Sequence, residues 1–200
     1  MGNSTYNTSN YGNGYVNEIV KTKESADSIV TLLAAKQHLV IDETFILDDQ
    51  LLLDKIDVAR SIAEDDCGRD LVETENVLEF VDFNGNAWEI NESPYVSIES
   101  LVGVDENGSN ELVLNTDYKV VKKNSFFVIL FPECKKYQTL TATFNTGYSS
   151  ETLPATIRQA ILVLIADMYD VERSSTTSGL NFRDNKTYQR LIQRHIVWRK

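Results

Sequence analysis

The sequence predicts an α+β protein in which a scaffold of about three helices carries an inserted, mostly antiparallel β region. Three observations lead to this fold class. Apolar residues recur with helical spacing between residues 29 and 63, strand-like runs fill residues 77 to about 146, and helical spacing returns after Gly147. We expect an extended polar N-terminal arm at 1–24, a folded domain at 25–173 with its β insertion at about 77–146, and an extended basic C-terminal arm at 174–200.

The N-terminal arm is rich in Asn, Ser, Thr, Tyr and Gly and has almost no aliphatic side chain before Val16. Such a composition does not bury enough apolar surface to order the chain by itself. We therefore predict an arm that is either disordered or ordered only by a partner. In the second case Tyr6, Tyr11 and Tyr15 would stack on a neighbouring chain.

Two helices are predicted before the β region. The first begins after a cap at Ser25 and ends near His38. The second begins after Asp48 and Asp49, whose carboxylates favour the positive end of the helix dipole, and it stops at Gly68. The apolar stripe of this second helix consists of Leu52, Ile56, Ala59 and Ala63.

The β region is predicted from seven short runs rich in β-branched and aromatic residues. Asn84-Gly85 and Asn107-Gly108 separate such runs, and Asn-Gly is a strong hairpin signal. Tight turns between short strands indicate a compact antiparallel sheet or small barrel. The runs are Val77–Asp82, Ala87–Ile90, Val96–Val104, Glu111–Leu114, Tyr118–Val121, Phe126–Phe131 and Thr139–Phe144.

A third helix is predicted after Thr152 and Pro154, which stand in the order of a cap and a first-turn proline. It has the broadest apolar stripe of the chain, so we expect it to pack in the core against Leu52, Ile56 and Ala59 of the second helix. This stripe consists of Ile157, Ala160, Ile161, Leu164, Ile165 and Met168.

Charge is distributed unevenly along the chain. The whole chain carries −11, from 19 Lys and Arg against 30 Asp and Glu. Residues 1–150 hold 11 basic against 25 acidic side chains (−14), and residues 151–200 hold 8 against 5 (+3). The acidic body argues against a general binder of nucleic acid or of anionic membranes, and the basic tail is typical of an interaction arm. No run of about 18 apolar residues is present that would span a membrane.

Candidate catalytic and metal-binding groups are sparse. His38 and His195 are the only histidines, and no nucleophile elbow accompanies them. The carboxylates of 64–66 and Asp70 would supply oxygen ligands to a divalent ion, but consecutive acids at a helix end are more typical of a solvated face. The segment 105–108 lacks the spacing of a calcium loop and indicates a turn. We predict no enzymatic activity, no metal and no cofactor.

The two cysteines, Cys67 and Cys134, are too few and too far apart for a disulfide framework or a zinc knuckle. We expect two free thiols in a protein assembled in a reducing cytoplasm.

Particular segments, in this order, resemble the bacteriophage head–tail connector family, also called head-completion adaptors. The first is Ala34-Ala35-Lys36-Gln37-His38-Leu39-Val40-Ile41-Asp42 followed by Asp48-Asp49, and the next are Ile56-Asp57-Val58-Ala59-Arg60, Ile62-Ala63-Glu64 and Cys67-Gly68-Arg69-Asp70-Leu71. The later ones are Ser93-Pro94-Tyr95-Val96-Ser97-Ile98-Glu99-Ser100-Leu101, Phe144-Asn145-Thr146-Gly147-Tyr148 and Leu153-Pro154-Ala155-Thr156-Ile157-Arg158-Gln159-Ala160-Ile161 running to Met168-Tyr169. The resemblance covers roughly residues 30 to 173, the greater part of the predicted connector domain.

The resemblance implies a structural virion protein without enzymatic activity. It implies a homo-oligomeric ring, usually twelvefold, that sits below the portal protein, joins head to tail and lets genomic DNA pass without binding it specifically. Its partners would be the portal and a tail protein or next adaptor, with no membrane involved. The location would be the head–tail junction of a virion assembled in the host cytoplasm.

Two candidate surfaces follow from these expectations. The C-terminal segment commonly reaches into the portal in this family, so we predict portal-docking residues Arg190, Leu191, Arg194, Ile196, Trp198 and Arg199; the alternative is an amphipathic helix folded onto its own domain. A passing duplex is repelled by an acidic channel wall, so we predict that Asp54, Asp57, Glu64 and Asp65 face the lumen; the alternative is a solvated outer face.

Two other functions are weighed against the adaptor. The first is a β module of an accessory virion protein that binds a ligand or carbohydrate, which would be a stable monomer with affinity for sugars. The second is a metal-dependent nuclease of DNA packaging, for which the sequence shows no acidic cluster with an accompanying lysine.

Overall fold

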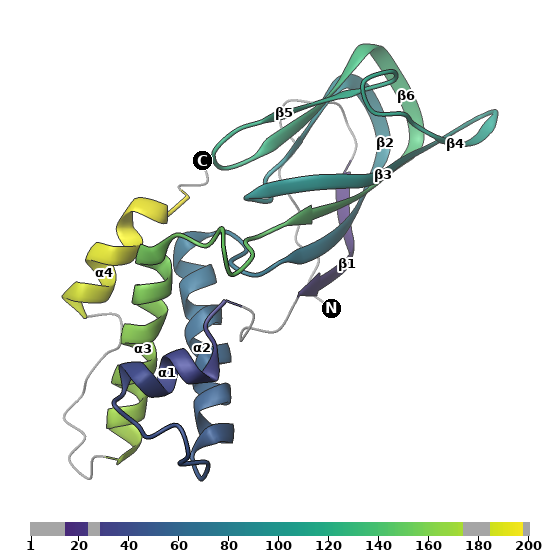
Figure 1. Ribbon diagram of the computed structural model, residues 1–200. Coiled ribbons are helices and arrows are strands. Elements are labelled where there is room, and N and C mark those ends of the chain that lie inside the picture. The colour runs from purple at the N-terminus through teal and green to yellow at the C-terminus, as the bar shows by residue number, and fades with distance from the viewer. Residues whose placement is uncertain (1–14, 24–28, 174–184, 198–200) are drawn as a thin grey trace. The chain divides into compact units, whose positions relative to one another are not determined.

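The computed structural model describes residues 15–23, 29–173 and 185–197, which form two compact units (Figure 1). The helical unit contains residues 29–72, 148–173 and 185–197, and the β unit contains residues 15–23 and 73–147. Helices and an antiparallel sheet in one chain confirm the predicted α+β class.

The helical unit is built around two long helices, α2 (Asp49–Cys67) and α3 (Ala155–Arg173). The shorter helices α1 (Leu32–His38) and α4 (Lys186–Ile192) pack against this pair, and a 3-10 turn, Gln193–His195, follows α4 (Figure 1).

The start predicted for the first helix is wrong. Ser25 lies outside the described residues, and Ile29 and Val30 are buried in a non-helical turn before α1. The cap is Thr31, whose side-chain oxygen accepts a hydrogen bond from the Ala34 amide at 3.2 Å. The hydroxyl of Thr31 satisfies one of the amides that a helix start leaves free, and Ile29 and Val30 contribute to the core instead.

The predicted bounds of α2 are confirmed to within one residue, since Asp49 is the first residue of the helix. Asp48 precedes the helix, and Gly68 ends it in the left-handed conformation (φ 66°), with its amide donating to the Glu64 carbonyl at 2.8 Å. Glycine adopts this conformation without the steric penalty that a side chain adds.

The predicted core contact between α2 and α3 is also confirmed. Leu52, Ile56 and Ala59 of α2 belong to the same buried cluster as the predicted stripe of α3, and Leu164 and Ile165 are fully buried. Removing one such aliphatic side chain from water contributes about 1.5–3 kcal/mol, so this stripe is a main source of stability for the helical unit. The α3 members of the cluster are Ile157, Ala160, Ile161, Leu164, Ile165, Met168 and Tyr169, and Leu153 joins them from just before the helix.

The β unit is a six-stranded antiparallel sheet among the described residues. Its strand order is β1-β2-β6-β3-β4, and β5 pairs with β6 outside this path. The strands are β1 (Tyr15–Lys23), β2 (Thr74–Ile90), β3 (Tyr95–Asp105), β4 (Gly108–Glu111), β5 (Lys119–Lys122) and β6 (Phe127–Thr146).

Two of the predicted turns have different outcomes. Asn107-Gly108 lies at the hairpin between β3 and β4, as predicted, with Asp105 paired to Gly108. Asn84-Gly85 does not form a hairpin, because β2 continues through it and the register with β6 shifts between Gly85 and Ala87. A glycine inside a strand often marks such an irregularity, which bends the strand without ending it.

The two long strands bend so that their halves share one aromatic core. The rings of Phe127 and Phe144, from opposite ends of β6, lie 5.0 Å apart, whereas a straight strand would separate these residues by roughly 55 Å at its usual rise. The rings of Phe80 and Trp88 from the two halves of β2 lie 5.6 Å apart. Both strands therefore fold back on themselves around the same cluster.

Residues 15–23, predicted as part of the N-terminal arm, form the edge strand β1, which pairs with β2. Val16 is buried in the aromatic cluster, and the Lys21 ammonium pairs with the Glu92 carboxylate at 3.1 Å. For these residues the predicted choice between disorder and a partner is wrong, because the chain's own sheet orders them. Tyr6 and Tyr11 lie outside the described residues.

Candidate functional site

The C-terminal segment folds against the helical unit through α4. Tyr188 and Ile192 are buried in the helical core, and the Tyr188 hydroxyl donates to the Asp66 carboxylate at 2.8 Å. The Asn185 side chain accepts from the Thr187 and Tyr188 amides, and its own amide group donates to Asp167 at 2.6 Å. Residues 185–197 therefore follow the alternative interpretation, an amphipathic segment packed on its own domain.

The predicted portal-docking residues divide into three groups. Arg190 and Arg194 are exposed, and Leu191 and Ile196 are half-buried. Trp198 and Arg199 lie outside the described residues. The structure therefore leaves two of the predicted cations available on the surface of the segment.

The end of the described segment is held by contacts that the sequence did not indicate. The Val197 amide donates to the Cys67 carbonyl at 2.8 Å, and the His195 Nε2 lies 2.7 Å from the Thr156 hydroxyl. Burial, with smaller contributions from the charges of Arg69 and Arg194, lowers the pKa of His195 from its ordinary value. The neutral ring is thus favoured at this position, where its contact anchors the segment to α3. Only the tertiary fold brings His195 to Thr156, so no local sequence pattern identified this contact.

Three of the four carboxylates predicted to face the lumen are exposed on α2, namely Asp54, Asp57 and Asp65. Glu64 differs, because it is buried, accepts a hydrogen bond from the Leu71 amide at 3.0 Å and pairs with Arg60. Its carboxylate makes these bonds within the helical unit, so we remove Glu64 from the residues predicted to face the lumen.

Arg60 joins two of these carboxylates, since it also pairs with Asp57 at 2.8 Å. Burial alone would lower the pKa of Arg60, but the hydrogen bonds and charges of Asp57 and Glu64 raise it overall. The guanidinium therefore stays charged and neutralises part of the acidic face of α2.

The acidic group near the end of α2 is dispersed among separate partners. Asp66 accepts from Tyr188, Glu64 pairs with Arg60, and Asp70 is buried. Within residues 15–23, 29–173 and 185–197, no three His, Cys, Asp or Glu side chains are placed to hold a metal ion together.

Both cysteines are free thiols in different environments. Cys67 is fully buried, and burial raises the pKa of its thiol to about 12. A thiol with so high a pKa stays protonated and is a poor nucleophile. Cys134 is exposed.

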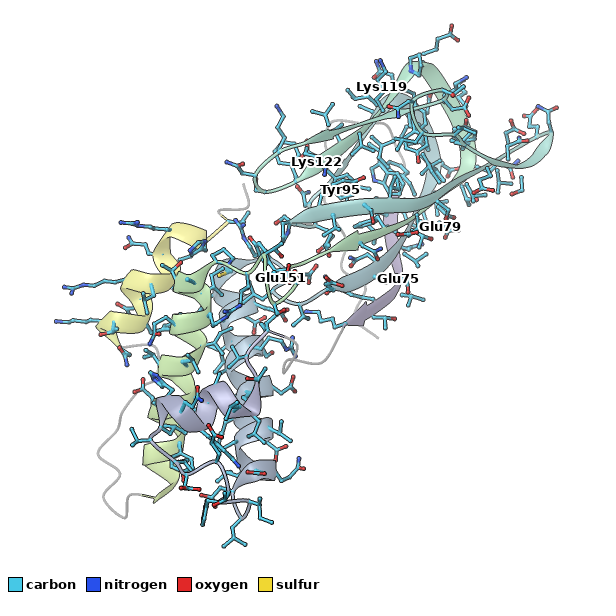
Figure 2. All side chains as sticks on the ribbon, viewed as in Figure 1. Glu75, Glu79, Tyr95, Lys119, Lys122 and Glu151 are labelled. Carbon is cyan, nitrogen blue, oxygen red and sulfur yellow. The ribbon has the colours of Figure 1, made fainter. Side chains whose placement is uncertain are left out.

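Charged side chains of the β unit are carried by separate strands. The Lys122 ammonium lies 4.6 Å from the centre of the Tyr95 ring, a cation–π contact (Figure 2). Lys119 is exposed on the same strand, β5, whereas Glu75 and Glu79 come from β2 (Figure 2).

None of the helices in the described part of the chain has the length and apolar character needed to cross a membrane.

Comparisons with known proteins give structural matches only. No family model matches the sequence, and no curated protein matches it. The fold is similar to a chain in the neck of an empty gene transfer agent particle determined with C6 symmetry, with TM-score 0.67 and 18% identity over 92% of this chain and 96% of the other.

Two further solved structures give the same result. A chain in the virion of the native gene transfer agent particle matches with TM-score 0.65 and 19% identity. A chain in the neck of the native particle, determined with C12 symmetry, matches with TM-score 0.65 and 18% identity. Both matches cover 92% of this chain and 96% of the other. The chain therefore shares its fold, almost from end to end, with chains of gene transfer agent particles, two of them in neck structures.

Proposed function

We propose that this chain is a structural adaptor of a phage-like particle. It forms a homo-oligomeric ring at the head–tail junction, between the portal and the next adaptor or tail protein. The observation that carries this proposal is the fold likeness to gene transfer agent neck chains, which extends over 92% of this chain and 96% of theirs. The C6 and C12 symmetries of those structures support a ring, and we propose twelve copies.

A structural role rather than an enzymatic one is supported by how the reactive side chains are used. His195 anchors the C-terminal segment, Cys67 is buried and protonated, and Glu64 is paired with Arg60. Each of these groups makes its contacts within the helical unit, which is the use expected in a structural protein.

Docking on the portal is assigned in this proposal to the C-terminal segment. The exposed Arg190 and Arg194 would pair with portal carboxylates, with Leu191 and Ile196 beside them and with Trp198 and Arg199 beyond the described residues. Aromatic and arginine anchors tend to dominate interface energy.

Passage of DNA is assigned to an acidic or neutral channel wall. Asp54, Asp57 and Asp65 are the exposed carboxylates of α2 that would face a passing duplex. Repulsion between carboxylates and phosphates would keep the genome centred during packaging and ejection, whereas lysine and arginine would retain it through salt-dependent contacts.

The test is co-expression of this chain with the portal protein of the same particle, followed by cryo-electron microscopy of the purified complex. We expect a ring coaxial with the portal, α2 carboxylates toward the axis and the C-terminal segment against the portal. A stable monomer that does not bind the portal but binds glycans would instead support the alternative function, a carbohydrate-binding module.

Variants for this experiment must leave α4 intact. Deleting residues 180–200 would remove the buried Tyr188 and Ile192 and destabilise the helical unit itself. Trp198→Ala avoids this problem, and we expect it to weaken portal binding by about 2 kcal/mol, measured by titration calorimetry. Thr187→Ala, an exposed position on α4, is the matched control and is expected to bind as the wild type does. Undiminished binding of Trp198→Ala contradicts the docking assignment.

A further inference from the structure

The loop between α1 and α2 exposes an unusual amount of apolar surface. Val40 is 92% exposed, Ile46 70% and Leu47 82%, all within eight residues. Single exposed apolar residues are ordinary on a protein surface, but a cluster of them marks an interaction site. We call Val40, Ile46 and Leu47 the apolar knob.

The fold holds this loop in place from the inside. Lys36 is almost fully buried beneath it, and its ammonium donates to the Phe45 carbonyl at 2.8 Å and the Glu43 carbonyl at 3.2 Å. The same ammonium pairs with the Asp49 carboxylate at 2.5 Å. A buried charge with several partners orders the backbone around it. The knob is therefore presented to solvent by a structured loop.

The loop has its own local support as well. The Asp42 carboxylate accepts from the Thr44 amide at 2.9 Å, and the Phe45 amide donates to the Asp42 carbonyl at 3.0 Å. These bonds form a turn that directs the following residues outward, with Ile46 and Leu47 next in the chain.

The charges beside the knob are negative. Asp42 and Glu43 are exposed in the same loop, and Asp48 follows it half-buried, whereas Lys36 is enclosed and already paired. A surface that fits the knob must therefore combine exposed apolar side chains with lysine or arginine.

This chain carries such a surface on β5 and β6 of the β unit. Along β6, Phe127, Ile129 and Phe131 are buried, while Leu130 between them is 37% exposed on the outer face. The register pairs Leu130 with Lys119, and Val121, also 37% exposed, with Val128. Because paired residues of an antiparallel sheet point to the same side, these side chains form one patch.

Lysines surround this patch. Lys119 is exposed within it, and the exposed Lys123 directly follows β5, two residues after Val121. The half-buried Glu89 lies on the far side of Val128, on β2, and is the acidic neighbour of the patch. We call Lys119, Val121, Lys123, Val128 and Leu130 the lysine patch.

We propose that the apolar knob of one copy docks on the lysine patch of a second copy. Ile46 and Leu47 contact Val121 and Leu130, and Asp42 and Glu43 pair with Lys119 and Lys123 of the neighbour. The knob and the patch are different surfaces, so each copy uses one to bind its neighbour on one side and the other to bind the next. Such a head-to-tail contact closes into a ring when the rotation allows it. This inference rests on the proposed ring and names the surfaces that hold it together.

The experiment measures assembly of the full chain by sedimentation velocity across a concentration series, both free and with the portal. We expect Ile46→Ser with Leu47→Ser, and separately Lys119→Glu with Lys123→Glu, to raise the concentration needed for assembly by roughly tenfold or more. Val58→Ser and Val96→Ser, at exposed apolar positions of the two units, are matched controls that should assemble as the wild type does. Circular dichroism verifies that each variant is folded.

Charge reversal makes the test specific to this pair of surfaces. Asp42→Lys with Glu43→Lys should also block assembly, and combining these changes with Lys119→Glu and Lys123→Glu in one chain should restore rings. An equimolar mixture of the Ile46→Ser, Leu47→Ser variant with the Lys119→Glu, Lys123→Glu variant keeps only one intact contact and should yield dimers without rings.

The possible failures are distinguishable. If the wild type forms rings while the knob and patch variants assemble equally well, the contact proposed here is wrong and the adaptor function stands. If the wild type forms no ring at any concentration, with or without the portal, the adaptor function fails and this inference fails with it.

Discussion

The helical unit and the β unit build their cores from different side chains. In the helical unit the buried cluster is largely aliphatic and includes small alanines such as Ala59, Ala63 and Ala160. In the β unit it is dominated by aromatic rings, among them Phe80, Trp88, Phe127 and Phe144. Leucine and isoleucine on regular helices fill layers between neighbouring helices, whereas large rings fill the wider space inside a bent sheet.

This difference explains why one unit was easier to predict than the other. An aliphatic stripe recurs within a single helix, so α2 and α3 are evident from local spacing. The aromatic cluster joins residues far apart along the chain, such as Phe80 and Phe144, and local spacing does not reveal which of them meet. The two clusters share no residue, so each core substitution is expected to weaken mainly its own unit.

The largest effect is expected from Phe80→Ala in the aromatic core. Phe80 is 1% exposed, and its ring makes edge contacts with Phe83 at 5.2 Å and Trp88 at 5.6 Å. Losing the ring should lower the free energy of unfolding of the β unit by about 3–5 kcal/mol, measured by urea denaturation. Val96→Ala, exposed in the same unit, is the control. If the transition of the helical unit shifts as much as that of the β unit, the two cores are not energetically separate.

Leu164→Ala tests the aliphatic core in the same way. Leu164 is fully buried on α3 within the cluster that includes Leu52 and Ile56. We expect a loss of about 2–5 kcal/mol in the free energy of unfolding, since the cavity is only partly refilled by its neighbours. The exposed Leu33→Ala is the matched control. A loss below about 1 kcal/mol would mean that α3 contributes little to this core.

A smaller effect is expected from Gly103→Ala, which adds a methyl group to the β unit. A Cβ atom at Gly103 would lie 2.6 Å from the ring of Tyr137, closer than side chains pack without moving. We expect a cost of about 1–3 kcal/mol from displacing this ring. Measured in a Tyr137→Ala background, the same change should cost clearly less. Equal costs in both backgrounds would show that Tyr137 is not the reason for the glycine.

The smallest effect is expected from the pH dependence of the C-terminal segment. The pKa of His195 is lowered below its ordinary value of 6.5, mainly by burial, so the unfolded chain binds the proton more readily than the folded one. The stabilisation by the neutral ring is thus present above that value and is lost as the pH falls through the lowered pKa. The protection factors of the amides of residues 186–197, which are corrected for the intrinsic pH dependence of exchange, should be lower at about pH 5 than at about pH 7.5. His195→Gln should remove most of this difference, and an unchanged difference would assign it to another group.

The candidate surfaces were only partly predictable. Asp54, Asp57 and Asp65 are exposed as their positions off the apolar stripe indicated, but Glu64, equally polar in sequence, is buried. The difference depends on Arg60, which pairs with Glu64 from one turn earlier on α2, and on the Leu71 amide, which reaches Glu64 only after the chain turns at Gly68. The i,i+4 spacing of Arg60 and Glu64 is present in the sequence of α2, but the contact with the Leu71 amide is not.

The sequence by itself determined the α+β class, the bounds of α2, the core stripe of α3 and the hairpin at Asn107-Gly108. Each depends on interactions between residues a few positions apart, through helical periodicity, helix termini or a two-residue turn. Only the tertiary structure decided that β2 continues through Gly85, that residues 15–23 complete the sheet, and that α4 packs on its own helical unit. In each of these cases the deciding partner is distant in sequence: β6 for β2, β2 for β1, and Asp66 for Tyr188. The free energy of such contacts is gained only when the chain is already folded, so no local pattern records it.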